Sequence, residues 1–120
     1  MTSEAGCAAA FCRSLDVNGQ TIMRYWCAKR RADGRAYRRA IDPLELPVAL
    51  LPLLQIHERL ADGRYICRLA GTMLAQVYGQ DPTGRTMDEM VGGSALQSRV
   101  AMFDRALATG RPVHYRAQLS

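Results

Sequence analysis

The chain has 120 residues, of which 48% are hydrophobic and 22% are charged, and its net charge at pH 7 is +5. This length suits one domain that buries roughly two-thirds of the surface of its unfolded chain, and the composition is ordinary for a soluble globular protein. No apolar run approaches the ~20 residues that span a bilayer, and no basic segment leads into the apolar residues 5–12. We therefore expect a cytoplasmic protein without a membrane segment or a cleaved secretory signal.

Residues 1–19 mix Ala, Ser, Gly and Cys without a period, so we expect a poorly ordered tail there and a folded domain over residues 20–120. A helix is predicted from Gln20 onward, because apolar side chains recur at helical spacing. These side chains are Ile22, Met23, Trp26 and Cys27. Lys29, Arg30 and Arg31 are expected in the last turn, with Gly34 ending the helix. The apolar stripe must be buried, either on the sheet of its own domain or at an interface with a second chain or a partner.

A hairpin is predicted in the middle of the chain. The prolines of residues 35–52 disfavour a long helix in this connector, although residues 44–51 can form a short one that begins at Pro43. Residues 53–58 are expected to form a strand. In residues 64–70, Tyr65, Cys67 and Leu69 alternate with other side chains, which is the period of a half-buried strand. Asp62-Gly63 is a tight-turn pair, so the two strands are predicted to be antiparallel neighbours.

Helices and one more strand are predicted after the hairpin. Residues 73–78 have helical spacing and Gly79 can end that helix, while residues 81–84 have the composition of a turn. Thr86 and Glu89 have the spacing of a capping box, and so do Ser94 and Gln97 at the start of a longer helix. The predicted inner face of the longer helix carries Leu96, Val100, Phe103 and Leu107, with Arg99 and Asp104 outside. Residues 113–119 alternate apolar and polar side chains, which indicates a strand.

The order of these elements resembles the PAS domain, in particular its bacterial single-domain branch. In that branch, a strand is followed by the motif R-L-x-G-T, a short helix, the pair Y-G, a turn of the form D-x-T-G-R and an acidic helix. The matching residues are Arg68, Leu69, Gly71, Thr72, Tyr78, Gly79, Asp81, Thr83, Gly84 and Arg85, together with the upstream Trp26 and Ile41-Asp42-Pro43. The resemblance implies an α/β (α+β) fold with an antiparallel sheet, short helices on one face and an N-terminal amphipathic helix. It also implies that two strands should follow Ser120, so we expect a fragment, a shortened variant, or a sheet completed by another copy.

The resemblance implies a ligand pocket between the sheet and its helices, although close packing alone would account for the same side chains. Its candidate lining is Tyr65, Cys67, Leu69, Met73, Val77, Tyr78 and Phe103. No cofactor is expected, and a small-molecule ligand is left open. The motif N-C-R-F-L of flavin-binding relatives is absent, which argues against Cys67 as a photoreactive cysteine.

No catalytic or metal site can be assembled from the sequence. His57 and His114 fall on the polar faces of predicted strands, without the companions that a metal requires, and are expected at the surface. The four cysteines form no C-x-x-C pair and are expected to be reduced thiols. No phosphate-binding glycine loop or nucleophile motif is present, so we do not expect an enzyme.

The positive charge is concentrated in one segment. Six of the 16 basic residues lie there, namely Lys29, Arg30, Arg31, Arg35, Arg38 and Arg39. Such a cluster either faces solvent or a protein partner, or it contacts the phosphates of a nucleic acid. The sequence therefore predicts a non-enzymatic sensory or regulatory module that dimerises or docks to a signalling partner, with nucleic-acid binding as the alternative.

Overall fold

A computed structural model describes residues 15–114. The chain forms two compact units. Within the described residues, unit 1 comprises 15–47 and 106–114, and unit 2 comprises 48–105. The structure is a mixed α+β fold with a two-stranded antiparallel sheet and several helices, as the sequence predicted.

Unit 1 contains helix α2 (Val17–Ala28), followed by two short 3₁₀ helices, η1 (Arg38–Ala40) and η2 (Pro43–Glu45). Helix α2 begins three residues earlier than predicted, because Asp16 caps it by accepting a hydrogen bond from the Gly19 amide at 2.8 Å. The tail was predicted to extend to residue 19, whereas residues 17–19 belong to this helix. Residues 1–14 of the predicted tail lie outside the described residues. The helix also ends earlier than predicted, so Lys29, Arg30 and Arg31 follow it and do not form its last turn.

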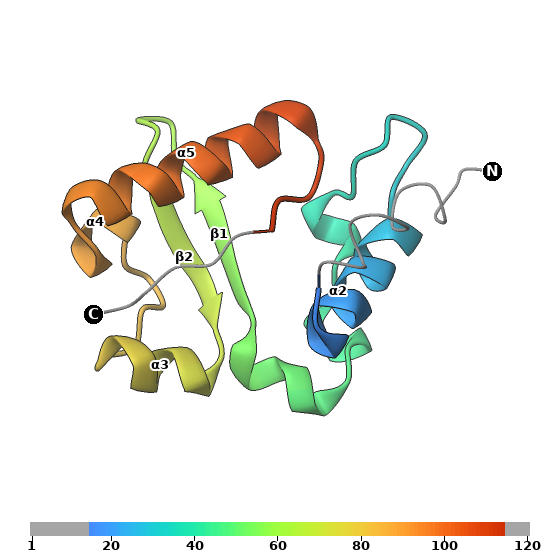
Figure 1. Ribbon diagram of the computed structural model, residues 1–120, viewed down its shortest axis with the longest axis horizontal. Coiled ribbons are helices and arrows are strands. Elements are labelled where there is room, and N and C mark those ends of the chain that lie inside the picture. Colours follow the sequence, from blue (N-terminus) through green and yellow to red (C-terminus); the bar gives the residue numbers. More distant parts are fainter. Residues whose placement is uncertain (1–14, 115–120) are drawn as a thin grey trace. The chain divides into compact units, whose positions relative to one another are not determined.

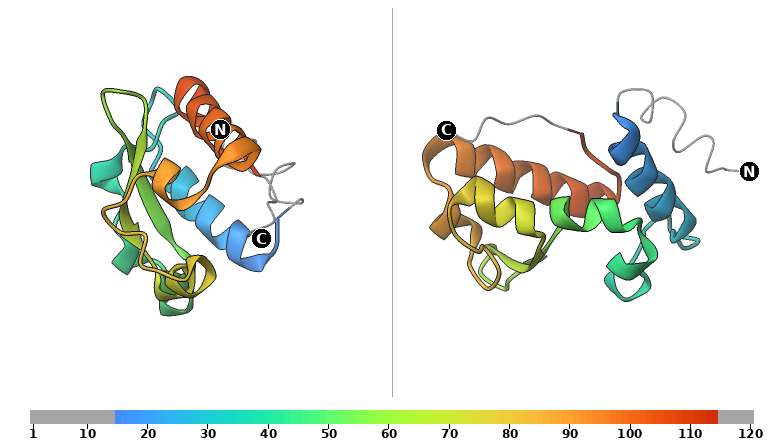
Figure 2. Two further views of the ribbon diagram at one scale, coloured as in Figure 1. Left: turned by 90° about the vertical axis from the view of Figure 1, so that its left-hand side faces the viewer. Right: turned by 90° about the horizontal axis from the view of Figure 1, so that it is seen from below.

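Unit 2 contains the hairpin and the short helices around it. Helix η3 (Val48–Leu53) leads into β1 (Gln55–Arg59) and β2 (Tyr65–Ala70), and then come α3 (Thr72–Tyr78), α4 (Met87–Met90) and α5 (Gly93–Thr109), whose last turn belongs to unit 1. Helix α5 passes across the hairpin (Figure 1), and α3 lies beside η3 (Figure 2). The first strand starts two residues later than predicted, because residues up to Leu53 complete the 3₁₀ helix.

The predicted hairpin is confirmed, and it carries one irregularity. The register pairs Ile56 with Leu69 but His57 with Cys67, so Arg68 is an extra residue in β2. Such a bulge interrupts the alternation along β2 itself, so Cys67 and Leu69 lie opposite consecutive residues of β1. His57 is thereby placed opposite Cys67, a residue that is only 1% exposed. The prediction that His57 lies on the solvated face is therefore wrong.

The D-x-T-G-R turn lies along the second edge of β2. Gly84 donates to the Cys67 carbonyl at 2.7 Å, Cys67 donates to the Arg85 carbonyl at 2.9 Å, and Ile66 forms a bridge with Thr86. Gly84 has a φ of 83°, which an L side chain adopts only at a cost. The turn thus occupies part of an edge that would otherwise present unpaired backbone groups.

Helix ends confirm two predictions and correct a third. Gly79 ends α3 in the left-handed conformation at φ 75°, and Thr86 and Glu89 form the predicted capping box of α4. Helix α5 begins at Gly93, so Ser94 lies within its first turn and is not its cap. Val113 and His114 are not part of a strand, and the rest of the predicted strand 113–119 lies outside the described residues.

Candidate functional site

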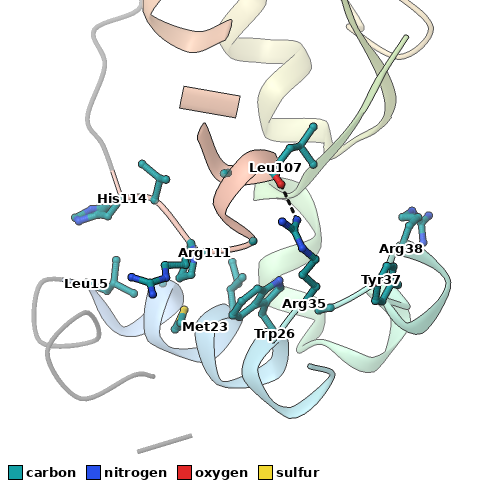
Figure 3. Close-up of a pocket in the computed structure, with 16 residues that line it drawn as sticks. Leu15, Met23, Trp26, Arg35, Tyr37, Arg38, Leu107, Arg111 and His114 are labelled. Atoms are coloured by element: carbon teal, nitrogen blue, oxygen red, sulfur yellow. Dashed lines mark hydrogen bonds between the residues drawn. The ribbon is translucent and has the colours of Figure 1, made fainter. Parts of the chain in front are cut away.

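The apolar stripe of α2 forms one side of a groove in unit 1 (Figure 3). Met23 and Cys27 are buried, while Ile22 remains 36% exposed. Ile22, Met23 and Trp26 face Leu107, Pro112 and Val113 across a space of about 600 Å³. This volume lies within the ~300–1,000 Å³ that is usual for binding sites. The stripe predicted as a dimer or partner interface is therefore only partly covered within its own unit.

Arg35 fixes the wall of the groove opposite α2. Its guanidinium donates from Nη1 to the Leu107 carbonyl at 2.6 Å and from Nη2 to the Ala108 carbonyl at 3.0 Å (dashed line to Leu107 in Figure 3). These carbonyls belong to the last turn of α5, where a cation satisfies acceptors that the helix leaves free. A Cβ at Gly110 would lie 2.9 Å from Arg35 Cγ, which is too close. Gly110 also has a φ of 68°, which an L side chain adopts only at a cost, so steric contact and backbone conformation both favour glycine.

The segment 42–45 is tied to α2 by a hydrogen-bonded tyrosine. The Tyr25 hydroxyl accepts from the Asp42 amide at 2.8 Å and donates to Glu45 at 2.5 Å, and Lys29 pairs with Glu45 at 3.1 Å. Hydrogen bonds from Tyr25 and Lys29 lower the pKa of the Glu45 carboxyl. Asp42 also caps η2 by accepting from the Leu44 amide at 3.0 Å. The I-D-P motif therefore fastens the connector to the N-terminal helix.

The predicted basic patch is not a continuous cationic surface. Arg30 lies over the Trp26 ring at 5.9 Å, and Arg31 lies over the Tyr37 ring at 5.4 Å. Arg38 donates to the Ile41 carbonyl at 2.8 Å, while Arg39 is exposed. Together with Lys29 and Arg35, most of these cations therefore have partners inside unit 1.

Cations also line the groove. They are Arg35, Arg38 and Arg111, and none of the described residues that line the groove is acidic. The groove thus combines an apolar floor with positively charged side chains at its margin. The sequence predicted the apolar stripe of α2 that forms the floor of the groove. It did not predict that Arg111 and the apolar residues after α5 also line the groove, because they lie near α2 only in the folded chain.

Only some of the residues that were predicted to line a pocket lie together in the interior of unit 2. Tyr65 and Cys67 are buried, and the Tyr65 ring meets the Phe103 ring edge-on with centroids 5.0 Å apart. Tyr78 and Leu69 are half-buried, whereas Met73 is 43% exposed and Val77 is 46% exposed. Met73 and Val77 therefore do not line an interior pocket.

The space beside Cys67 is small. It is bounded by Gln55, His57, Cys67, Tyr78, Pro82, Arg85, Met87 and Met90, and its volume is about 10 Å³. This is about the size of the space that one water occupies. Burial raises the pKa of the Cys67 thiol, which keeps it protonated and unreactive.

Two polar side chains that the sequence assigned to the surface lie in this interior. Arg99 is only 6% exposed, and its Nη1 donates to the Tyr78 hydroxyl at 2.9 Å. The His57 ring packs against Phe103 at 5.2 Å, and burial, together with the charge of Arg99, lowers its pKa. Arg99 lies three residues after Leu96 and four before Phe103, so helical spacing alone indicates the inner face. The prediction that Arg99 lies outside is wrong.

The described residues hold no cluster of three or more potential metal ligands, and none of the helices among them is both long and apolar enough to cross a membrane. No curated protein and no solved structure matches the chain significantly. A family model described as PAS domain matches residues 16–118. The match covers the helix, the hairpin and the turn that carry the motifs described above. The chain therefore belongs to the PAS domain family, whose members are generally sensory and regulatory modules.

Proposed function

We propose that this PAS domain is a non-enzymatic regulatory module that docks a signalling partner through the groove of unit 1. The binding segment of the partner is expected to carry apolar anchors flanked by acidic side chains. We assign the module to the bacterial cytoplasm, because its motifs resemble those of the bacterial single-domain branch. The observation that carries the proposal is an open apolar groove lined by cations and by no described acid.

The positive charge at the margin of the groove indicates whether a different protein or a second copy of this chain binds there. Two copies that meet through the same groove bring their cationic margins together, and like charges at an interface disfavour association. An acidic segment neutralises Arg38 and Arg111 and also gains speed of association from their field. We therefore favour a different protein over a homodimer.

The size of the groove sets the strength of binding. Two or three anchors of the size of leucine each contribute about 1.5–3 kcal/mol on burial. Association costs at least ~4 kcal/mol in lost freedom of motion, so at most about 5 kcal/mol remains and a Kd of about 0.2 mM or weaker is expected. This range suits a transient signalling contact.

Nucleic-acid binding is less well supported. Phosphate contacts require free cations, and Lys29, Arg30, Arg31 and Arg35 are engaged with groups of unit 1. Binding to DNA or RNA that falls steeply with salt is therefore an outcome against the proposal.

The single tryptophan of the chain lines the groove, so its fluorescence reports on occupancy. The probe is an amphipathic peptide with leucine anchors and glutamates, and the control peptide carries lysine in place of each glutamate. We expect a saturable change in Trp26 emission with the acidic peptide only. Ile22→Asp should abolish it, whereas Val17→Asp should not, because Val17 is 77% exposed on the same helix and does not line the groove.

Light scattering of the purified chain completes the test. A monomer is expected without peptide. A dimer that dissociates in Ile22→Asp but persists in Val17→Asp would identify a second copy as the occupant. Equal response to both peptides would show that the cations do not select the partner. Either result refutes docking of an acidic segment.

A further inference from the structure

The groove of unit 1 has an apolar floor that remains open to solvent. Ile22 is 36% exposed and Leu107 is 52% exposed, and both line the groove together with Trp26. Its volume of about 600 Å³ lies within the range of sites that hold small molecules as well as side chains. Because burial removes apolar surface from water, a concave apolar floor of this size favours an occupant with a substantial apolar part.

One cation beside this floor has no partner of its own in the described part of the chain. Arg35 donates to two carbonyls of α5, and Arg38 donates to the Ile41 carbonyl. Arg111 is exposed, and only its backbone amide is engaged, by donating to the Thr109 hydroxyl at 3.2 Å. Its guanidinium forms no hydrogen bond or ion pair with a described residue. An anion that binds Arg111 therefore gains a charged donor without displacing an internal contact.

The free cation lies toward one end of the groove. Figure 3 shows Arg111 and Leu15 on one side of Trp26. Tyr37 and Arg38 lie on the other side of the Trp26 ring. The groove therefore matches a molecule with one anionic head, placed at Arg111, and one apolar tail that extends along the floor past Trp26.

We propose that the groove of unit 1 binds a medium-chain fatty carboxylate. The carboxylate accepts hydrogen bonds from the Arg111 guanidinium, and the alkyl chain lies on Ile22 and Trp26. The described residues that line this site belong to α2 and the residue before it, to residues 35–38, and to the end of α5 with the segment that follows, so the site is separate from the interior of unit 2. Its regulatory consequence rests on the function proposed above: a groove that holds the carboxylate excludes the anchors of a partner, so fatty carboxylates inhibit docking.

A series of chain lengths tests the apolar part of the site. The full chain is titrated with octanoate, decanoate and dodecanoate below the concentrations at which they form micelles, and Trp26 emission reports binding. Each added methylene that the groove buries should lower Kd about fourfold. Equal Kd values for octanoate and dodecanoate would show that the alkyl chain stays in water, which overturns the proposal.

The charge of the head group is tested with decylammonium, which has the chain length of decanoate and the opposite charge. Decanoate should bind more tightly, and Arg111→Gln should weaken its binding about two- to fivefold, the range of an exposed ion pair. Arg39→Gln is the control, because Arg39 is exposed and does not line the groove, and it should leave binding unchanged. Equal binding of decanoate and decylammonium, or equal losses in the two variants, overturns the proposal.

Two variants of α2 locate the ligand. Both place a carboxylate on the helix, but Ile22 lines the groove and Val17 does not. Ile22→Asp should abolish the response to dodecanoate, and Val17→Asp should keep it. If Ile22→Asp does not fold, Leu107→Asp replaces it, because Leu107 lines the groove and is more exposed. A response that persists in the folded groove variant places the ligand elsewhere and overturns the proposal.

Competition separates this inference from the function proposed above. The acidic peptide is labelled with fluorescein and followed by anisotropy, and dodecanoate at its own Kd should double the apparent Kd of the peptide. Binding of dodecanoate without binding of the peptide refutes the docked partner and leaves the fatty-carboxylate site standing. Binding of the peptide without binding of dodecanoate refutes the fatty-carboxylate site. Simultaneous binding of both with unchanged affinities refutes a shared groove and the regulation that follows from it.

Discussion

Gly71 joins β2 to α3 and is the glycine of the R-L-x-G-T motif. A Cβ at this position would lie 2.2 Å from the Leu51 carbonyl oxygen and 2.3 Å from the carbonyl carbon and oxygen of Pro52. Ordinary contacts of a Cβ are 3.4–4 Å, so these backbone atoms of η3 would have to move by more than 1 Å. The φ of Gly71 is −69°, which any residue adopts. Close approach of two backbone segments, and not conformation, therefore requires glycine.

Gly71→Ala should lower the free energy of unfolding by about 3 kcal/mol. Overpacking of a close contact costs roughly 1–3 kcal/mol. Separation of the segments also threatens the hydrogen bond from the Gly71 amide to the Leu54 carbonyl, 2.8 Å long, which contributes about 1 kcal/mol. Urea unfolding followed by circular dichroism measures the change.

Gly92→Ala is the matched control. A Cβ at Gly92 meets no atom within 4 Å, and its φ lies outside the left-handed region. The same substitution should therefore change stability by less than about 1 kcal/mol. If Gly71→Ala is as stable as Gly92→Ala, the backbones of η3 and the β2–α3 junction are not in close contact.

Three further predictions concern single polar groups. The pKa of His57 is lowered in the folded state, so the free energy of unfolding should decrease as the pH falls below 6.5. Urea unfolding at several pH values should show this decrease in the wild type and not in His57→Gln. Tyr65→Phe should lower the free energy of unfolding by about 1 kcal/mol, because the hydroxyl donates to Asp104 at 2.7 Å. Burial and that bond raise the pKa of Tyr65 to about 12, so absorbance should show its ionisation there, with the associated stability lost as the pH rises from 10 to 12. Arg35→Gln should lower Tm by several degrees, because two carbonyls of α5 lose a charged donor, while Arg39→Gln should leave Tm unchanged.

Local signals in the sequence predicted unit 2 well. The alternation around Tyr65 and Cys67 is confirmed by their burial, and the turn at Asp62-Gly63 by the pairing of β1 with β2. The capping box of α4 was also predictable, because its donors and acceptors lie three residues apart. Each of these features depends on neighbours in the sequence, and for that reason one sequence suffices to find them.

Features that depend on distant segments were missed. The bulge at Arg68 places Cys67 opposite His57, and alternation within β1 alone gives no sign of it. The groove requires the segment after α5 to return to α2, a contact between residues about 90 apart in the sequence. A capping role for Arg35 likewise depends on carbonyls 72 and 73 residues away. The candidate sites were therefore less predictable than the fold that holds them.

The arginines of this chain show why a charge count says little about function. Arg35 and Arg99 carry the same charge and the same fork of donors, yet Arg35 finds two carbonyls and Arg99 finds one hydroxyl. The first is satisfied by its own chain, which makes it a structural residue. The second keeps a buried Nε without a hydrogen-bond partner among the described residues. The same side chain therefore has different surroundings at these two positions, and a charge count distinguishes neither.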